Sequence, residues 1–264
     1  MDVKPTIKEY WEKCTPMAFG PEKWSYEKKR SFRYGLQDYM HDSFRFEDWS
    51  GKRVLEIGCG AGIDTLEFAR NGAIVTAVDM TDNAVKLTTE LAKEAGLKIE
   101  VHQAPATKLP FKDSTFDCVY SYGVLHHIPD VEVALGEISR VLKKSGKIML
   151  MLYNRDSLLY AYSIVYRHGI REGLLLNGGC TEPELVARYS ERVEGCPYTR
   201  AYTRQDAKEV LSKWFDDIEV TVRYNVIDTA TERKVKLGLD DKWELGWHLI
   251  VKATRNTPRA GRNP

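Results

Sequence analysis

The 264-residue sequence lacks a marked excess of either charge, because 39 lysines and arginines stand against 38 aspartates and glutamates. A chain without a basic surplus has no long-range attraction for nucleic acid or for an anionic membrane surface. It also lacks an apolar run of membrane-spanning length, and residues 1–13 lack the apolar core of a secretory signal. These absences predict a cytoplasmic chain with no membrane span and disfavour a nucleic-acid partner.

Cysteine is sparse, and its spacing is uninformative. The five cysteines are an odd number and include no C-x-x-C pair. Such a set gives no sign of a disulfide framework. We therefore expect reduced and mostly buried thiols, with Cys59 and Cys118 at the ends of predicted strands.

Apolar, strand-like runs alternate with helix-like segments between residues 53 and 154. The runs read RVLEIG, IVTAVD, IEVHQ, FDCVYS and GKIMLMLY. This alternation is typical of an α/β domain, in which helices cover both faces of a parallel sheet. The intervening helices are predicted to start near Ile63, after Thr81 and near Val131.

The flanking segments have a different character. Residues 1–50 are rich in aromatic side chains without strand alternation, and we expect a helical cap there. Residues 51–154 form the predicted core, and residues 155–202 interrupt its rhythm as an expected lid over the acceptor site. Residues 203–256 supply a final helix and the last two strands, IEVTVRYNV and GWHLIVKA. The polar tail, 257–264, is expected to be disordered.

The run VLEIGCGAG predicts a buried strand that ends in a tight, glycine-rich turn. Its glycines are Gly58, Gly60 and Gly62, whereas the dinucleotide fingerprint G-x-G-x-x-G would need glycine at Ile63. NAD is therefore disfavoured. Asp79, at the end of the next strand, is placed to accept the hydroxyls of a ribose, which indicates an adenosine ligand.

Five motifs in order resemble the class I S-adenosylmethionine-dependent methyltransferases, specifically the type-11 domain found in quinone-biosynthesis C-methyltransferases. They are VLEIGCGAG, VTAVDM, LPF, FDCVYSYGVLHHIPD and RVLKKSGKIML. The resemblance covers roughly residues 50–154. It implies a Rossmann-like, mostly parallel, seven-stranded sheet and a reaction that converts S-adenosyl-L-methionine to S-adenosyl-L-homocysteine.

The same resemblance implies a set of donor-binding residues. Glu56 would meet the ammonium group of the methionine moiety, and the glycine turn would let that moiety approach the backbone. Asp79 would bind the ribose hydroxyls, while Met80 packs against the adenine. The full predicted set is Glu56, Gly58, Gly60, Gly62, Asp79, Met80, Ala106, Thr107 and Ser121.

One position departs from the family pattern. The family usually has D-A-x-x-L-P-F, and this sequence has P-A-T-K-L-P-F, so Pro105 replaces the usual adenine-binding aspartate. Gln103, Thr107 or a water molecule is expected to supply the missing hydrogen bond.

Methyl transfer needs an acceptor aligned with the sulfonium methyl group in a dry pocket, and no metal is expected. Where the acceptor carries a proton, a histidine is a suitable base. Adjacent side chains are expected to point apart, so His126 and His127 are not expected to serve together, either as paired bases or as two ligands of one metal. The sequence also resembles phosphobase methyltransferases that have a histidine at the first of these places, working with a tyrosine from an N-terminal helix, and this resemblance makes His126 the preferred base. Tyr10 and Tyr34 are candidate catalytic partners. The alternative is that both histidines only fix the loop by hydrogen bonds.

The sequence thus predicts an enzyme that methylates a small molecule on oxygen, nitrogen or carbon, with its oligomeric state unspecified. A non-catalytic scaffold that binds S-adenosylmethionine is the alternative from another class. A nucleic-acid methyltransferase is disfavoured, because the loop Ser121-Tyr122-Gly123-Val124 lacks the Asn/Asp-Pro-Pro-Tyr/Phe pattern. A dehydrogenase is the third alternative.

Overall fold

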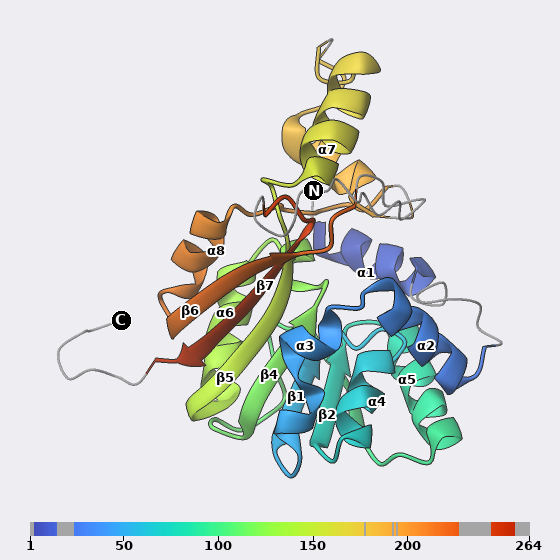
Figure 1. The fold of residues 1–264 in the computed structure, drawn as a ribbon, viewed down its shortest axis with the longest axis vertical. Coiled ribbons are helices and arrows are strands. Elements are labelled where there is room, and N and C mark those ends of the chain that lie inside the picture. Colours follow the sequence, from blue (N-terminus) through green and yellow to red (C-terminus); the bar gives the residue numbers. More distant parts are fainter. Residues whose placement is uncertain are drawn as a thin grey trace.

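A seven-stranded sheet lies at the centre of the computed structural model (Figure 1). The structure describes residues 3–14, 24–176, 178–191, 193, 195–226 and 244–256. The strands are β1 (Arg53–Ile57), β2 (Ile74–Asp79), β3 (Glu100–Gln103), β4 (Phe116–Tyr122), β5 (Leu142–Tyr153), β6 (Phe215–Arg223) and β7 (His248–Arg255). Their order is β3-β2-β1-β4-β5-β7-β6, and β7 is antiparallel to both of its neighbours. The predicted mostly parallel sheet is confirmed.

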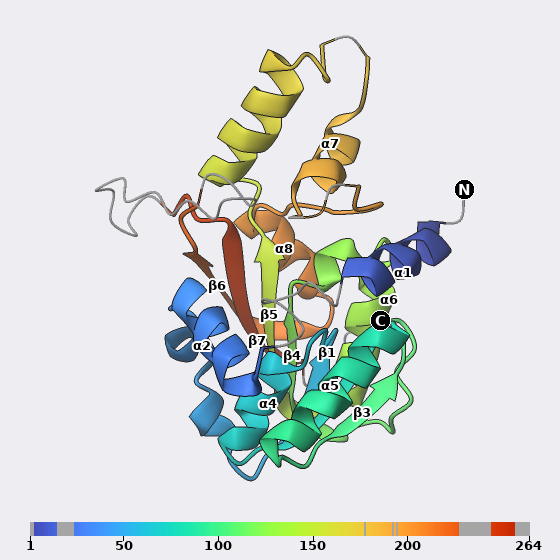
Figure 2. The ribbon, with the colours of Figure 1, turned by 90° about the vertical axis from the view of Figure 1, so that its right-hand side faces the viewer.

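Helices cover both faces of this sheet (Figures 1 and 2). The α-helices are α1 (Val3–Cys14), α2 (Tyr26–Leu36), α3 (Met40–Phe44), α4 (Ile63–Arg70), α5 (Asp82–Ala95), α6 (Val131–Val141), α7 (Glu182–Tyr189) and α8 (Arg204–Leu211). The 3-10 turns η2 (Phe46–Trp49) and η3 (Leu125–His127) and the π-helix η4 (Leu159–Arg171) complete the set. The expected disordered tail, 257–264, lies outside the described residues.

Burial explains why β1 is central. Val54, Leu55 and Ile57 are at most 1% exposed, since β1 pairs with β2 on one side and β4 on the other and is covered on both faces. A strand buried on both faces needs such a continuous apolar run. The acid in this run, Glu56, is buried with it.

The three predicted helix starts are confirmed, at Ile63, Asp82 and Val131. Thr81 caps α5 by accepting a hydrogen bond from the Ala84 N–H, and Gly96 ends the helix in the left-handed conformation. Helix α6 stops at Val141. Lys143 is already in β5, because Leu142 begins the pairing with β4.

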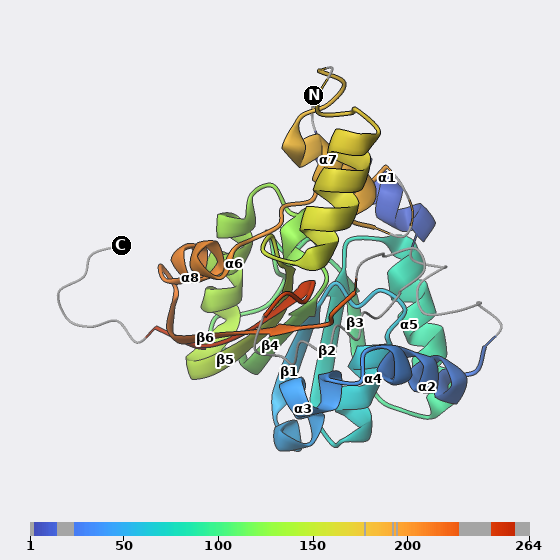
Figure 3. The ribbon, with the colours of Figure 1, turned by 45° about the horizontal axis from the view of Figure 1, so that its top comes forward.

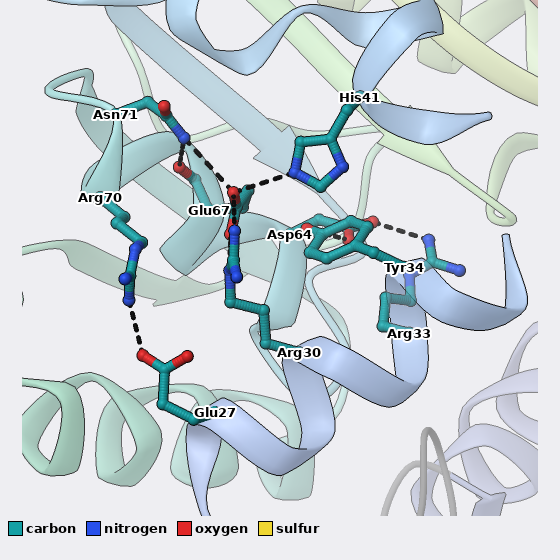
Figure 4. A network of polar contacts seen from close by, with 9 residues as sticks. All are labelled: Glu27, Arg30, Arg33, Tyr34, His41, Asp64, Glu67, Arg70 and Asn71. Atoms are coloured by element: carbon teal, nitrogen blue, oxygen red, sulfur yellow. Dashed lines mark hydrogen bonds and ion pairs between the residues drawn. The ribbon is translucent and has the colours of Figure 1, made fainter. Parts of the chain in front are cut away.

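Helix α2 is joined to α4 by buried ion pairs (Figure 4). The Arg30 guanidinium donates to both carboxylate oxygens of Glu67, whose side chain is 2% exposed. Arg33 donates to both oxygens of Asp64, at 2.8 and 3.2 Å. These pairs fix the N-terminal helices against the helix that follows β1.

Helix α1 is held against the first turn of α5 by a carboxylate. The Glu12 carboxylate accepts from the backbone N–H of Asp82 at 3.1 Å and of Asn83 at 2.8 Å, at the first turn of α5. These N–H groups have no partner within their own helix. Figures 2 and 3 show α1 at the same end of the sheet as η4 and α7, beyond the carboxyl end of β5.

The Glu67 pair gives a prediction about stability. Burial tends to raise the pKa of Glu67, but the Arg30 and His41 contacts outweigh it, so the pKa is lowered. The stabilisation is therefore present above the unfolded pKa of about 4.3 and is lost as pH falls through the lower folded value. We expect Glu67→Gln to reduce the free energy of unfolding by about 1–3 kcal/mol at pH 7 in urea titrations.

The difference between the variant and the wild type should shrink as pH falls through the lowered folded pKa of Glu67. Glu27→Gln is the matched control, because the Glu27–Arg70 pair is about half exposed on both sides. It should change stability by at most about 0.5 kcal/mol. An equal effect of the two changes would contradict the assignment.

Candidate functional site

A cavity of about 700 Å³ opens at the carboxyl ends of β1, β2 and β4. Its walls come from the turn after β1, the end of β2, residues 104–107, the loop after β4, helix α1 and the start of β7. Ligands of open α/β sheets bind at this edge, where neighbouring strands connect in opposite directions.

The turn after β1 adopts a backbone that requires glycine. Gly58, Gly60 and Gly62 all have positive φ, at 75°, 52° and 79°. A Cβ at Gly58 would overlap the side chain of Val124, and one at Gly62 would lie 2.8 Å from Thr88 Cγ2. A Cβ at Gly60 would meet no described atom within 4 Å, and Gly60 lines the cavity. Two of the glycines thus permit packing, and the third leaves room for a ligand.

Glu56 is a buried carboxylate that lines this cavity and is 3% exposed. Its Oε2 accepts a hydrogen bond from the Thr65 hydroxyl. Burial, and after it the neighbouring Asp64 carboxylate, raises the pKa of Glu56 well above its usual value. A cationic ligand group beside Glu56 would stabilise its ionised form.

Asp79 ends β2 on the opposite side of the glycine turn. Its carboxylate accepts from the Gly60 N–H at 3.1 Å, and from the N–H and hydroxyl of Thr81 at 2.9 and 2.8 Å. Burial raises the pKa of Asp79, although these donors favour the charged form. Asp79, the predicted ribose-binding residue, therefore also holds the glycine turn against β2.

The predicted adenine side is only partly assembled at the cavity. Met80, Ala106 and Thr107, which were predicted to lie near the adenine, line the cavity. Ser121 is not among the described lining residues, because its hydroxyl donates to the Ile57 carbonyl at 3.0 Å and so joins β4 to β1. Gln103 is also absent from the described lining and donates to the Met80 carbonyl. Of the two residues suggested to replace the missing aspartate, Thr107 alone reaches the cavity.

The two histidines lie together on η3. Their ring centroids are 4.2 Å apart, so the expectation that adjacent side chains point apart is wrong on this tight turn. His127 lines the cavity, whereas His126 is not among the described lining residues. His126 is 0% exposed and stacks on Tyr153 at 3.8 Å. Burial, and after it His127, lowers the pKa of His126 well below its usual value.

The two candidate tyrosine partners have other contacts. Tyr10 lines the cavity from α1, but its hydroxyl donates to the backbone carbonyl of Val193. Tyr34 is not among the described lining residues, and its hydroxyl donates to Asp64 at 3.0 Å. A pairing of Tyr34 with His126 is therefore not formed in the structure.

Asp64 is a cavity residue that sequence reasoning missed. The residue types at the start of α4 indicated only an acid favourable to the helix dipole. In the structure its carboxylate accepts from Arg33, from Tyr34 and from the Tyr120 hydroxyl at 2.9 Å, and it is 7% exposed. Nothing in the local pattern around Arg33 signals this contact, because the two residues are brought together only by tertiary folding.

A second missed group lies at the start of β7. The Tyr122 hydroxyl donates to Gln37 Oε1 at 2.8 Å and lies 3.1 Å from His248 Nδ1. Tyr39 contacts both Tyr122 and His248 at 2.5 Å. Gln37, Tyr122 and His248 line the cavity, so this wall carries polar groups from three distant parts of the chain.

The comparison with known proteins agrees with this geometry. Residues 55–150 match the family model of the methyltransferase domain. This match identifies residues 55–150 as a methyltransferase domain. The matched segment contains β1 to β4 and most of β5, and therefore the glycine turn, Asp79 and the histidine pair.

Curated relatives match part of the chain. The ubiquinone biosynthesis O-methyltransferase of Coxiella burnetii is 33% identical over 116 residues, which are 44% of this chain and 49% of that protein. The enzyme of the same name from Bartonella bacilliformis is 27% identical over 161 residues, 60% of this chain and 63% of that protein. The chain thus spans about half the length of the Coxiella relatives.

Solved structures share the fold over nearly the whole chain. The PH0226 protein of Pyrococcus horikoshii superposes with a TM-score of 0.61 at 18% identity, covering 94% of this chain and 99% of that one. The [4+2]-cyclase SpnF gives 0.60 at 17% identity, with 95% of each chain covered. A possible histamine N-methyltransferase from Thermotoga maritima gives 0.56 at 16% identity, covering 95% and 100%. At these identities the likeness establishes the fold.

Features of the cavity fit S-adenosylmethionine. The open space at Gly60 admits a close approach to the backbone of the turn. Glu56, which is buried, and Asp79, which is partly buried, place carboxylates on either side of that turn, where the ammonium and the ribose of the donor need negative partners. All five cysteines are free thiols, and no described helix is long and apolar enough to cross a membrane.

The different surroundings of the glycines give a prediction. Gly62→Ala should lower the free energy of unfolding by about 2–3 kcal/mol, because a methyl group there clashes with Thr88 and the backbone is left-handed. Gly60→Ala should cost only about 1 kcal/mol, from backbone strain alone. Titration calorimetry should nevertheless show at least tenfold weaker donor binding by Gly60→Ala. Unchanged affinity would mean that the donor does not approach this turn.

Proposed function

We propose that the chain is an S-adenosylmethionine-dependent methyltransferase that acts on a small-molecule acceptor. The observation that carries this proposal is a single cavity with two different ends. Glu56 and Asp79 line one end, and His127 with aromatic side chains lines the other, which we call the chamber. Its volume lies within the range of about 300–1,000 Å³ that is usual for small-molecule sites.

In the proposed complex, Glu56 binds the donor ammonium and Asp79 the ribose hydroxyls, while Met80 packs on the adenine. The sulfonium methyl group then faces the chamber beyond the glycine turn. Aromatic side chains from Trp11, Tyr153 and Trp247 line that chamber and exclude water from the reacting atoms. Most of the rate acceleration comes from alignment of the acceptor with the methyl carbon.

Two observations weigh against the alternatives. A scaffold without acceptor space would have aromatic side chains filling the chamber, and the cavity is open. A nucleic-acid substrate would need a basic surface, and the net charge is +1. We also propose a cytoplasmic location, because the cysteines are unpaired. SpnF is a [4+2]-cyclase that shares this fold, so methyl transfer must be measured rather than assumed from the fold.

The decisive experiment combines binding with transfer. Calorimetry should show saturable binding of S-adenosylmethionine and none of NADH. Asp79→Asn should weaken donor binding about 10- to 100-fold, because a hydrogen bond to a charged group is lost. Asp82→Asn, at a largely exposed site on the next turn, is the control and should bind normally.

Transfer itself is tested with a methyl-labelled donor and fractionated metabolite extracts. Label should appear in a small-molecule fraction, and His127→Ala should lower turnover while donor affinity stays within about twofold. A wild-type protein that binds the donor but never transfers label would favour the scaffold instead.

Glu56 predicts how donor affinity depends on pH. Its pKa is raised in the free protein, whereas the donor ammonium favours the ionised carboxylate. Binding must therefore expel a proton as pH falls toward the raised pKa, and affinity should decline from neutral pH downward. Glu56→Gln should bind more weakly at pH 8 and show a flat profile. A wild-type affinity that is constant from pH 8 to pH 5 would contradict the contact.

A further inference from the structure

Three metal-ligating side chains converge at the acceptor end of the cavity. One ligand atom from each of His126, His127 and Glu191 lies within 4.8 Å of the others. The histidines come from η3, and Glu191 follows α7, so the group joins the methyltransferase domain to the segment inserted after β5. His127 and Glu191 also line the cavity.

The hydrogen bonds of His127 fix its tautomer. Its Nδ1 lies 3.0 Å from the Tyr198 carbonyl oxygen, which can only accept, so Nδ1 carries the proton. Nε2 then presents a lone pair. It lies 3.4 Å from Glu191 Oε1 and makes no hydrogen bond to any described residue. A histidine that donates one N–H to a carbonyl and turns the other nitrogen toward a carboxylate has the arrangement of a metal ligand.

The separation of these atoms matches a shared ion. Two ligands bound at about 2.1 Å with a tetrahedral angle between them lie about 3.4 Å apart. Without a cation, a nitrogen lone pair would face a carboxylate oxygen across this gap in a buried site. Tyr153 donates to the same Glu191 oxygen at 2.7 Å and so holds the carboxylate in place.

His126 supplies the third observation. It is 0% exposed, and neither ring nitrogen has a hydrogen-bond partner of normal geometry among the described residues, although one faces the Met151 backbone. A buried ring nitrogen without a partner requires an explanation. A bound metal ion supplies one, and it also explains why the Glu191 carboxylate lies beside the histidines. Ligand atoms on one ion lie at most about 4.2 Å apart, so the three side chains close slightly when it binds.

We propose that His126, His127 and Glu191 bind a divalent transition-metal ion, such as Zn²⁺ or Fe²⁺, which holds a hydroxyl group of the methyl acceptor. Two imidazoles and one carboxylate are a ligand set for these ions that leaves coordination positions open. This assignment of the acceptor class rests on the proposed function. It replaces the expectation that the site needs no metal.

The chemistry follows from the open position. When the acceptor oxygen binds the ion, its hydroxyl proton passes to solvent, because the cation stabilises the anionic oxygen. A lone pair of that oxygen then forms a bond to the methyl carbon. The carbon–sulfur bond breaks, and its electron pair returns to sulfur to give neutral S-adenosylhomocysteine. His127 acts here as a ligand, whereas in a metal-free mechanism it would be available as a general base.

The test measures the metal directly. Wild-type protein, loaded with Zn²⁺ and dialysed, should retain a stoichiometric amount by mass spectrometry of the elements. Glu191→Gln and His127→Gln should lose it. His102→Gln is the matched control, because His102 and Glu100 form an exposed pair at 3.9 Å, and it should retain the ion. Circular dichroism and donor binding by each variant establish that it is folded.

Replacement by Co²⁺ reports the coordination. We expect visible bands of a four- or five-coordinate ion that are absent from Glu191→Gln and that shift with azide, a small probe of an open position. Absence of stoichiometric metal in the wild type, or its retention by both variants, would overturn the site. Bands insensitive to azide, or undiminished transfer by metal-stripped protein, would overturn its role.

These outcomes are separable from those that test the proposed function. A protein that binds Zn²⁺ through these residues but does not bind S-adenosylmethionine would refute the methyltransferase proposal and leave the metal site standing. A protein that binds the donor normally but retains no metal would refute the metal site and leave the methyltransferase proposal standing.

Discussion

A single buried carboxylate connects the parts of this molecule. Asp64 sits in the first turn of α4, directly after the glycine turn, and accepts hydrogen bonds from Arg33, Tyr34 and Tyr120. Through it the N-terminal helix α2, the donor turn and the centre of β4 share one polar contact. An unpaired charge at that depth would be costly, so the cap and the sheet have to come together for the site to exist.

The cavity built on this contact has two chemically distinct ends. Buried carboxylates and an open glycine backbone form one end, and imidazole and aromatic rings form the other. The first end comes from contiguous motifs in the methyltransferase domain. The second draws on α1, the segment after α7 and β7, which lie far apart in the sequence. Donor recognition and acceptor recognition are therefore encoded differently in the chain.

That difference explains what the sequence could predict. The alternation of strands and helices, the cap at Thr81 and the places of Glu56 and Asp79 on β1 and β2 follow from local periodicity and motif spacing, and the structure bears out the fold. Ser121 was named by resemblance alone, and no motif signals that its hydroxyl donates to the Ile57 carbonyl. Arg33, Gln37 and His248 carried no local signal at all. The convergence of His126 and His127 depended on η3, a turn too short to predict from residue type.

The hydrogen bond from the Gly60 N–H to Asp79 has a consequence for ligand recognition. It is made within the protein itself, so the shape of the donor turn is established when the chain folds. The entropic cost of ordering those glycines falls on folding and not on association. Stability against heat and affinity for the nucleoside are thereby linked through the Asp79 carboxylate, and substitutions that weaken its hydrogen bonds lower both together.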